Sequence, residues 1–268
     1  MTRATTFTTL VASIILLTTS SSQAKVIYVD WSATGSNDGG SWENAFIELT
    51  TALAAALAGD EVWVAEGVYR PAPPNGDRSA TFDLKSGVAV YGGFLGVESS
   101  EAERAPDLYP CILSGDLNGD DEFGATNVQE NSCNVVTATS CDENTILDGF
   151  VIERGYADSE PNCWRGAGIY IDEGHPIIRD CLFRHNKSLF SGGGVYVYWG
   201  SPSFEKCRFF MNGQRRGGAL YLSLHQGDHC SISDSFFGRN HASATGGAIY
   251  LTGGGIGSQQ QPIRRKFI

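Results

Sequence analysis

The acidic stretch SGDLNGDDEFG, residues 114–124, contains the side chains best suited to hold a ligand. Asp116, Asn118 and Asp120 have the 1, 3, 5 spacing of a calcium-binding loop, and hard cations prefer such oxygen ligands. The match is partial, because Asp121 stands where an EF-hand loop requires glycine and the twelfth position is not glutamate. The alternative, which the partial match favours, is a solvated acidic turn between structural repeats. We therefore predict no cofactor, with calcium at these three residues as the open alternative.

A second set of residues has the types that carbohydrate-active enzymes use: Asp148, Glu153, Arg154, Asp172 and Arg179. Such enzymes need clustered carboxylates that bind calcium together with an arginine or lysine base, or a pair of aspartates for hydrolysis. These five residues form no recognisable polysaccharide lyase or polygalacturonase signature. Because charged residues on the outside of a β-helix most often face solvent, we predict no catalytic residue.

Four tyrosines form a candidate ligand surface because they recur at a nearly fixed spacing. They are Tyr170, Tyr196, Tyr221 and Tyr250, and they are 26, 25 and 29 residues apart. A ladder of outward-facing aromatic rings can stack against sugar rings. The alternative, which we favour, is that the rings stack on one another and stabilise the surface of a sheet.

The tyrosines belong to a longer internal repeat. The segments GAGIYI, GGGVYV, GGALYL and GGAIYL alternate with CLFRHN, CRFFMN and SFFGRN, which end at Asn186, Asn212 and Asn240. Within GAGIYI, strand alternation places Ile169 and Ile171 on one face and the tyrosine on the other. Each asparagine suits a turn, where its amide can bond the backbone or the asparagine one coil away. A repeat near 26 residues without a helix predicts an all-β, right-handed parallel β-helix with equivalent positions ~4.8 Å apart.

Seven cysteines follow residue 110, and no two of them have CxxC spacing, which argues against a zinc or thioredoxin-type site. An odd number leaves at least one cysteine without an intramolecular disulfide. Cys181 and Cys207 fall on neighbouring coils of the predicted β-helix. They are consistent with either a buried pair of thiols or a disulfide, because adjacent parallel strands do not guarantee bridging geometry.

Residues 1–24 have the pattern of a secretory signal peptide. Arg3 provides the positive start, residues 10–17 a short apolar stretch, and Ser22-Gln23-Ala24 a small-residue cleavage site. Its removal leaves 18 basic and 30 acidic residues, a net charge of −12. This charge argues against nucleic acid or an anionic membrane surface as a partner. We predict export to the medium or the cell surface, with no transmembrane helix in the mature chain.

The segment SWENAFIELTTALAAALAGD, residues 41–60, predicts the one long helix. Ser41 suits the N-cap, Gly59 suits the C-terminal end, and Phe46, Leu49 and Leu53 lie on one apolar stripe that continues to residues 56 and 57. We predict that residues 25–60 form a strand and a helix that caps the N-terminal end of the β-helix. Residues 61–268 then form the β-helix itself.

The repeats resemble those of chlamydial polymorphic outer membrane proteins, in which GGAI-type and FxxN-type tetrapeptides alternate. Here these are Gly246–Ile249 and the segments 183–186, 209–212 and 237–240. The front half resembles a wider group of exported bacterial β-helix proteins through YVDWSATGSNDGGSWENAF, AGDEVWVAEGVY, GVAVYGGF, ILSGDLNGDD and LDGFVI, in that order. The resemblance implies a pectin-lyase-like right-handed β-helix with an N-terminal helix as cap. It also implies a secreted or cell-surface location, including the outer membrane, and no established reaction.

The preferred functional prediction is therefore an exported, non-catalytic, structural or adhesin-like β-helix whose partners are cell-surface glycans or other proteins. One alternative is a carbohydrate-active enzyme, such as a calcium-dependent polysaccharide lyase, and another is a glycan-binding module. The tail IGSQQQPIRRKFI departs from the resemblance, because more coils are expected after residue 255. We expect the sequence to stop within a coil, as in a truncated product.

Overall fold

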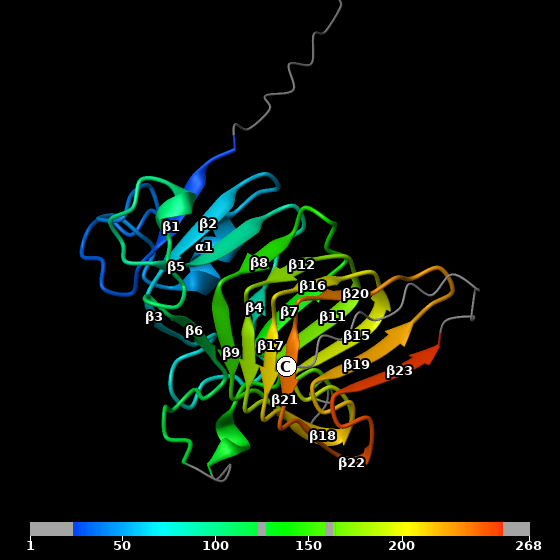
Figure 1. Cartoon of the computed structure of the whole chain (residues 1–268). Helices are drawn as coiled ribbons and strands as arrows, with labels where there is room; N and C mark the ends of the chain where they lie inside the picture. The colour runs from blue at the N-terminus through cyan, green and yellow to red at the C-terminus, as the bar shows by residue number, and fades with distance from the viewer. Residues whose placement is uncertain (1–23, 123–126, 159–162, 164, 254–268) are drawn as a thin grey trace, which may run out of the picture.

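The computed structural model describes residues 24–122, 127–158, 163 and 165–253. Over these residues the chain winds into a right-handed parallel β-helix of about six turns, as the repeat predicts. Figure 1 shows the coils following one another from the blue N-terminal strands at the upper left to the red strand at the right. The predicted signal peptide and the predicted broken C-terminal coil lie outside the described residues, apart from residue 24.

Over the described residues, four parallel sheets form the faces of the coils. Sheet 1 has seven strands, in spatial order β1 (Val26–Val29), β2 (Glu61–Ala65), β5 (Ala89–Phe94), β8 (Ile146–Asp148), β12 (Ile177–Arg179), β16 (Ser203–Glu205) and β20 (Ser231–Ser233). Sheet 2 has six, in the order β23 (Ile249–Gly253), β19 (Leu220–Leu224), β15 (Val195–Gly200), β11 (Ile169–Gly174), β7 (Val136–Thr139) and β4 (Phe82–Asp83).

Sheet 3 contains β21 (Phe236–Gly238), β17 (Arg208–Phe210), β13 (Leu182–Arg184), β9 (Phe150–Glu153), β6 (Cys111–Ser114) and β3 (Gly67–Tyr69). Sheet 4 contains β10 (Tyr156–Ala157), β14 (Lys187–Ser188), β18 (Gly213–Arg216) and β22 (His241–Thr245). A complete coil, such as β11 to β14, therefore contributes one strand to each sheet in turn.

The core consists of equivalent apolar side chains stacked from coil to coil. Ile169 pairs in register with Val195, which pairs with Leu220, and all three are fully buried. Phe183 and Phe209 stack at 4.7 Å between ring centroids, and the next ring, Phe237, follows at the same distance. That distance is the spacing of neighbouring strands, so the predicted register of the repeat is confirmed.

The glycine before each of these strands is required by the backbone. Gly192 has φ +67°, and a Cβ added there would lie 2.9 Å from Cβ of Tyr196. Gly166, Gly217 and Gly246 have φ within a degree of the same value. The chain therefore turns a corner at each glycine that other residues adopt only with strain.

The predicted long helix is shorter than expected. The helix α1 spans Leu49–Ala55, with Leu49 and Leu53 buried on its inner side and residue 57 exposed. Its N-cap is Glu48 and not Ser41, whose hydroxyl instead accepts a hydrogen bond from the backbone N–H of Asn44. The prediction was wrong at this end because the backbone of Phe46 bonds to strand β1.

Helix α1 packs against β1, β2 and β4, at the end of the chain where the coils begin. Its action as a cap for the β-helix stays a prediction. Two short 3-10 helices, η1 (Glu101–Glu103) and η2 (Val128–Glu130), lie in the excursions between coils. No helix within the described residues is long and apolar enough to cross a membrane.

One disulfide joins Cys133 to Cys163, while the other five cysteines are free. Cys181 and Cys207 are fully buried on neighbouring strands and remain thiols, which decides between the two alternatives for this pair. Their Sγ atoms lie 3.6 Å from the carbonyl oxygen of Leu147 and 3.3 Å from that of Ile178, respectively.

Candidate functional site

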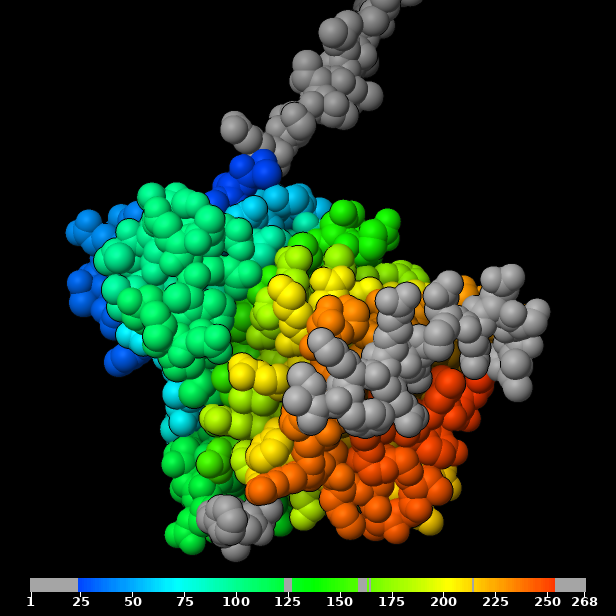
Figure 2. All heavy atoms as spheres, in the orientation of Figure 1, coloured from blue at the N-terminus to red at the C-terminus, as the bar shows by residue number. Residues whose placement is uncertain are grey.

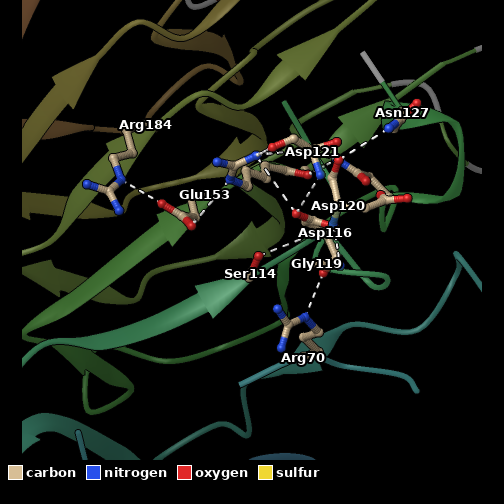
Figure 3. Close-up of polar contacts among 12 residues, drawn as sticks. Arg70, Ser114, Asp116, Gly119, Asp120, Asp121, Asn127, Glu153 and Arg184 are labelled. Atoms are coloured by element: carbon tan, nitrogen blue, oxygen red, sulfur yellow. Dashed lines mark hydrogen bonds and ion pairs between the residues drawn. The ribbon is translucent and has the colours of Figure 1, made fainter. Parts of the chain in front are cut away.

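The acidic stretch leaves the β-helix at the end of strand β6. Gly115 passes so close to the next coil that a Cβ there would lie 2.7 Å from the carbonyl oxygen of Arg154. Asp116 follows, buried, and its backbone oxygen accepts a hydrogen bond of 2.7 Å from Nε of Arg70. Figure 3 shows Arg70 on one side of the site, with Asp116 between it and Asp121.

The carboxylate of Asp116 shapes the turn that follows it. Its Oδ1 accepts hydrogen bonds from the backbone N–H groups of Gly119, at 2.6 Å, and Asp120, at 3.1 Å. Its Oδ2 accepts a third from the N–H of Asp121, at 3.2 Å. These bonds fold the loop around one carboxylate, so that the next two aspartates face it.

Four carboxylates converge here. Asp116, Asp120, Asp121 and Glu130 each place one oxygen within 4.8 Å of the corresponding oxygens of the other three. Glu130 comes from η2, on the returning part of the excursion. Carboxylate oxygens at this separation can share a hard cation.

One guanidinium group lies against this cluster. Nη1 of Arg154 is 3.3 Å from Oδ2 of Asp121 and 3.8 Å from Oδ2 of Asp116. Arg154 also approaches Glu153, with Nε 3.5 Å from Oε1. Its single charge is therefore shared among several carboxylates.

The surroundings raise the pKa of two members of the cluster above the ordinary value of a carboxyl group. Burial raises the pKa of Asp121, the bond from the side chain of Asn131 opposes this, and the neighbouring Asp116 raises it further. Burial also raises the pKa of Glu130, and the surrounding aspartates add to the effect. A positive charge close to such a carboxyl group has the opposite effect, because it favours the ionised form.

The carboxylate cluster contains only two of the three residues of the predicted calcium loop. Asp116 and Asp120 belong to it, whereas Oδ1 of Asn118 points to the excursion after β3 and accepts a bond of 2.8 Å from N–H of Asn75. The sequence pattern missed Asp121 and Glu130. A run of two aspartates indicated the first, while no local spacing indicated the second, 14 residues after Asp116.

The five residues of the types that carbohydrate-active enzymes use lie on three sheets, apart from Arg154, which follows β9. Asp148, on β8, is fully buried, with Oδ2 2.6 Å from Nε of Arg179 and Oδ1 2.8 Å from Nη1 of Arg104. Arg104 comes from the excursion 95–110, the blue-green bulge at the upper left of Figure 2. Glu153, on β9, accepts a bond of 2.6 Å from Nε of Arg184, and Asp172 is on β11.

The four tyrosines form a continuous ladder on sheet 2. Tyr170 and Tyr196 stack at 5.7 Å between ring centroids, and the pairs Tyr196–Tyr221 and Tyr221–Tyr250 stack at 5.0 Å. Tyr196 is only 3% exposed and Tyr221 only 9%. The central rings therefore offer little surface to a sugar, which agrees with mutual stacking.

Comparison of the chain with protein-family models, curated proteins and solved structures finds no match.

Proposed function

We propose that this chain is the non-catalytic β-helix of an exported protein, secreted or held at the cell surface, with a structural or adhesin-like role. Its function in this proposal is to present an elongated, solvated surface to glycans or other proteins. The finer class belongs to the same proposal: a pectin-lyase-like β-helix related to the chlamydial polymorphic outer membrane proteins.

The observation that carries the proposal is how the repeated side chains are used. The repeated phenylalanines, asparagines and tyrosines each contact their own counterparts one coil away. Residues that recur for building a rod contact one another in this way, whereas residues of an active site converge on one cavity. The repeat therefore supports a scaffold.

The charged residues that resemble catalytic groups support the same conclusion. Asp148 is fully buried between two arginines, and a carboxylate held in this way cannot meet a polysaccharide. Glu153 is held by Arg184. Both carboxylates are therefore engaged in ion pairs, Asp148 in the interior and Glu153 nearer the surface, as we expect of a scaffold.

Two features support export. Residues 1–24 have the charge, apolar core and small-residue end of a signal peptide. The Cys133–Cys163 disulfide is of a kind that persists in oxidising compartments such as the periplasm or the medium.

The experiment compares the full chain with a variant that lacks residues 2–24, both expressed in a bacterium and fractionated. We expect the full chain outside the cytoplasm, shortened by the signal peptide, and the variant inside. A full chain that stays cytoplasmic at full mass would overturn export.

The same secreted protein then tests the non-catalytic part. Incubated with acidic polysaccharides, with and without a chelator, it should release no unsaturated uronates. Chelator-sensitive release would establish a calcium-dependent lyase instead. Binding of the intact protein to neutral or acidic glycans without release would favour the binding-module alternative.

A further inference from the structure

We propose that Asp116, Asp120, Asp121 and Glu130 bind one calcium ion, which joins the two ends of the excursion between β6 and β7. Both ends of the excursion contribute, since the aspartates follow β6 and Glu130 precedes β7. The site is independent of the proposed function of the whole chain. Figure 3 shows Asp116, Asp120 and Asp121 gathered beside the strand that carries Glu153.

Buried oxygen atoms without hydrogen bonds point to a ligand at this place. The side chain of Asp121 is 5% exposed, and its Oδ1 accepts no hydrogen bond from the described residues. Oε1 of Glu130 is in the same condition. Oδ1 of Asn131 also accepts no hydrogen bond from the described residues. Asn131 is 1% exposed, and its Nδ2 donates a hydrogen bond of 2.9 Å to Oδ2 of Asp121.

All three of these unsatisfied atoms are acceptors, and all three belong to one excursion of the chain. Native proteins leave few buried polar atoms unpaired, and each one calls for an explanation such as an ion. Three unpaired carbonyl or carboxylate oxygens within one loop require either several donors or one cation. A calcium ion accepts six to eight oxygen ligands and so meets the requirement in a single step.

The charge at the site leads to the same conclusion. Four carboxylates face one another, and among the described residues the guanidinium of Arg154, which also approaches Glu153, is the one basic group that forms ion pairs with them. The guanidinium of Arg70 lies beside them, where its Nε donates to the backbone oxygen of Asp116. The cluster retains a negative excess when all four groups are ionised, even with both arginines counted. A divalent cation removes most of that excess and turns mutual repulsion into attraction to a common centre.

The ligand types select among metals. The cluster contains carboxylate oxygens alone, with no histidine or cysteine in it, which disfavours zinc and other transition metals. Magnesium needs a small, near-ideal octahedron, whereas four carboxylates on a loop suit the larger and more variable calcium shell. A groove of about 660 Å³, lined by Asp121, Asn131 and Arg154, adjoins the site and admits the waters that would complete that shell.

The test uses the purified protein, stripped of metal with a chelator and dialysed. Calcium chloride is titrated in by calorimetry, and thermal unfolding is followed in parallel. With calcium at 100 times the Kd, we expect the Tm to rise by about 5–10 °C. Neither heat nor a Tm shift up to about 10 mM calcium, well above the affinity range of extracellular modules, would overturn the proposal.

Three variants make the test specific: Glu130→Gln, Asp121→Asn and, as a matched control, Glu143→Gln. Glu143 lies exposed in the turn before β8, so its change removes one negative charge away from the cluster. We expect E130Q to fold without metal at least as stably as the metal-free wild type, because it relieves repulsion, and to lose at least tenfold in calcium affinity. D121N should behave alike, and E143Q should keep the full shift.

Each outcome has a defined reading. If E130Q and D121N retain the wild-type calcium shift, the ion binds elsewhere and the assignment is wrong. If D121N does not fold, E130Q alone decides, because Glu130 accepts no bond at the oxygen in question. If magnesium produces the larger shift at equal concentration, the choice of calcium is wrong.

Discussion

The side-chain amide of Asn186 donates a hydrogen bond of 3.1 Å to Oδ1 of Asn212, the equivalent residue one coil further along. The same Oδ1 accepts a bond of 3.2 Å from the backbone N–H of Asn186. Asn212 repeats both bonds with Asn240, at 3.1 and 3.0 Å. The asparagines thus link three successive coils inside the turn, at positions where Asn186 and Asn212 are almost completely buried.

This chain of amides predicts a large effect for a single substitution. Asn212→Ala removes the acceptor of the backbone N–H of Asn186 and the side-chain donor to the carbonyl of Phe183, and leaves Nδ2 of Asn186 with only its bond to the carbonyl of Ile152. Unsatisfied buried groups are costly, so the unfolding free energy should fall by about 2–4 kcal/mol. Urea unfolding measures it, with Asn144→Ala, at an exposed turn position, as the control. Equal stability of the two variants would show that the ladder contributes little.

The salt bridges of Asp148 predict a second destabilisation. Asp148→Asn removes the charge that two arginines face from opposite oxygens, and leaves both cations without it. The Arg179 side chain is 34% exposed and Arg104 keeps its pair with Glu101, so we expect a loss of about 1.5–3 kcal/mol in urea unfolding, the range for hydrogen bonds to charged groups. Asp107→Asn is the matched control, because its side chain is 92% exposed and its pair with Arg208 lies at the surface. A loss no greater than that of D107N would contradict the burial of Asp148.

The tyrosine ladder predicts a loss of stability and not of glycan binding alone. Tyr196 stacks on two rings, and Nη1 of Arg165 donates to its hydroxyl at 3.3 Å. Tyr196→Ala should cost about 3–5 kcal/mol in urea unfolding, as expected for a buried aromatic ring. Tyr250, on the last described strand of sheet 2 and with one stacked neighbour among the described residues, should cost clearly less when changed to Ala. A variant Y196A that unfolds like wild type but fails to bind glycans would establish the ladder as a binding surface.

The repeat was predictable because its residues act locally and identically in every coil. Alternation around Tyr196 and a turn at Asn212 each follow from a few neighbouring letters, and stacking then fixes their partners. The start of helix α1 was not predictable in this way. Ser41 has good N-cap chemistry, but the backbone around Phe46 pairs with β1, a contact that no local pattern contains.

The acidic site also has a part that the local sequence predicts and a part that depends on contacts between distant segments. The turn around Asp116 follows from its own spacing, since its carboxylate bonds the next N–H groups. Glu130 reaches the cluster only because the excursion returns to the same coil, and Arg154 comes from that coil. The disulfide likewise joins Cys133 to Cys163 across 30 residues, a pairing that seven cysteines leave undetermined.

The buried thiols predict how stability depends on alkaline pH. Burial raises the pKa of Cys111 and Cys207 to about 12 and that of Cys141 to about 11, from an ordinary value near 9. Above pH 9 the unfolded chain therefore loses these protons while the folded chain keeps them. Because the folded state then binds more protons, its stability falls as the pH rises, by about 1.4 kcal/mol per thiol and pH unit.

Cys207→Ala isolates one of these thiols. Its unfolding free energy at pH 8 should be lower than that of wild type, because a buried side chain is shortened. Between about pH 9 and pH 11, however, it should decline less steeply, by about 1.4 kcal/mol per pH unit, since one proton fewer is released on unfolding. Urea unfolding at several pH values gives both slopes, in oxygen-free buffer without reductant so that the free thiols stay reduced and the Cys133–Cys163 disulfide stays intact. Parallel slopes would mean that the Cys207 thiol ionises as readily in the fold as outside it, contrary to its complete burial beside the carbonyl of Ile178.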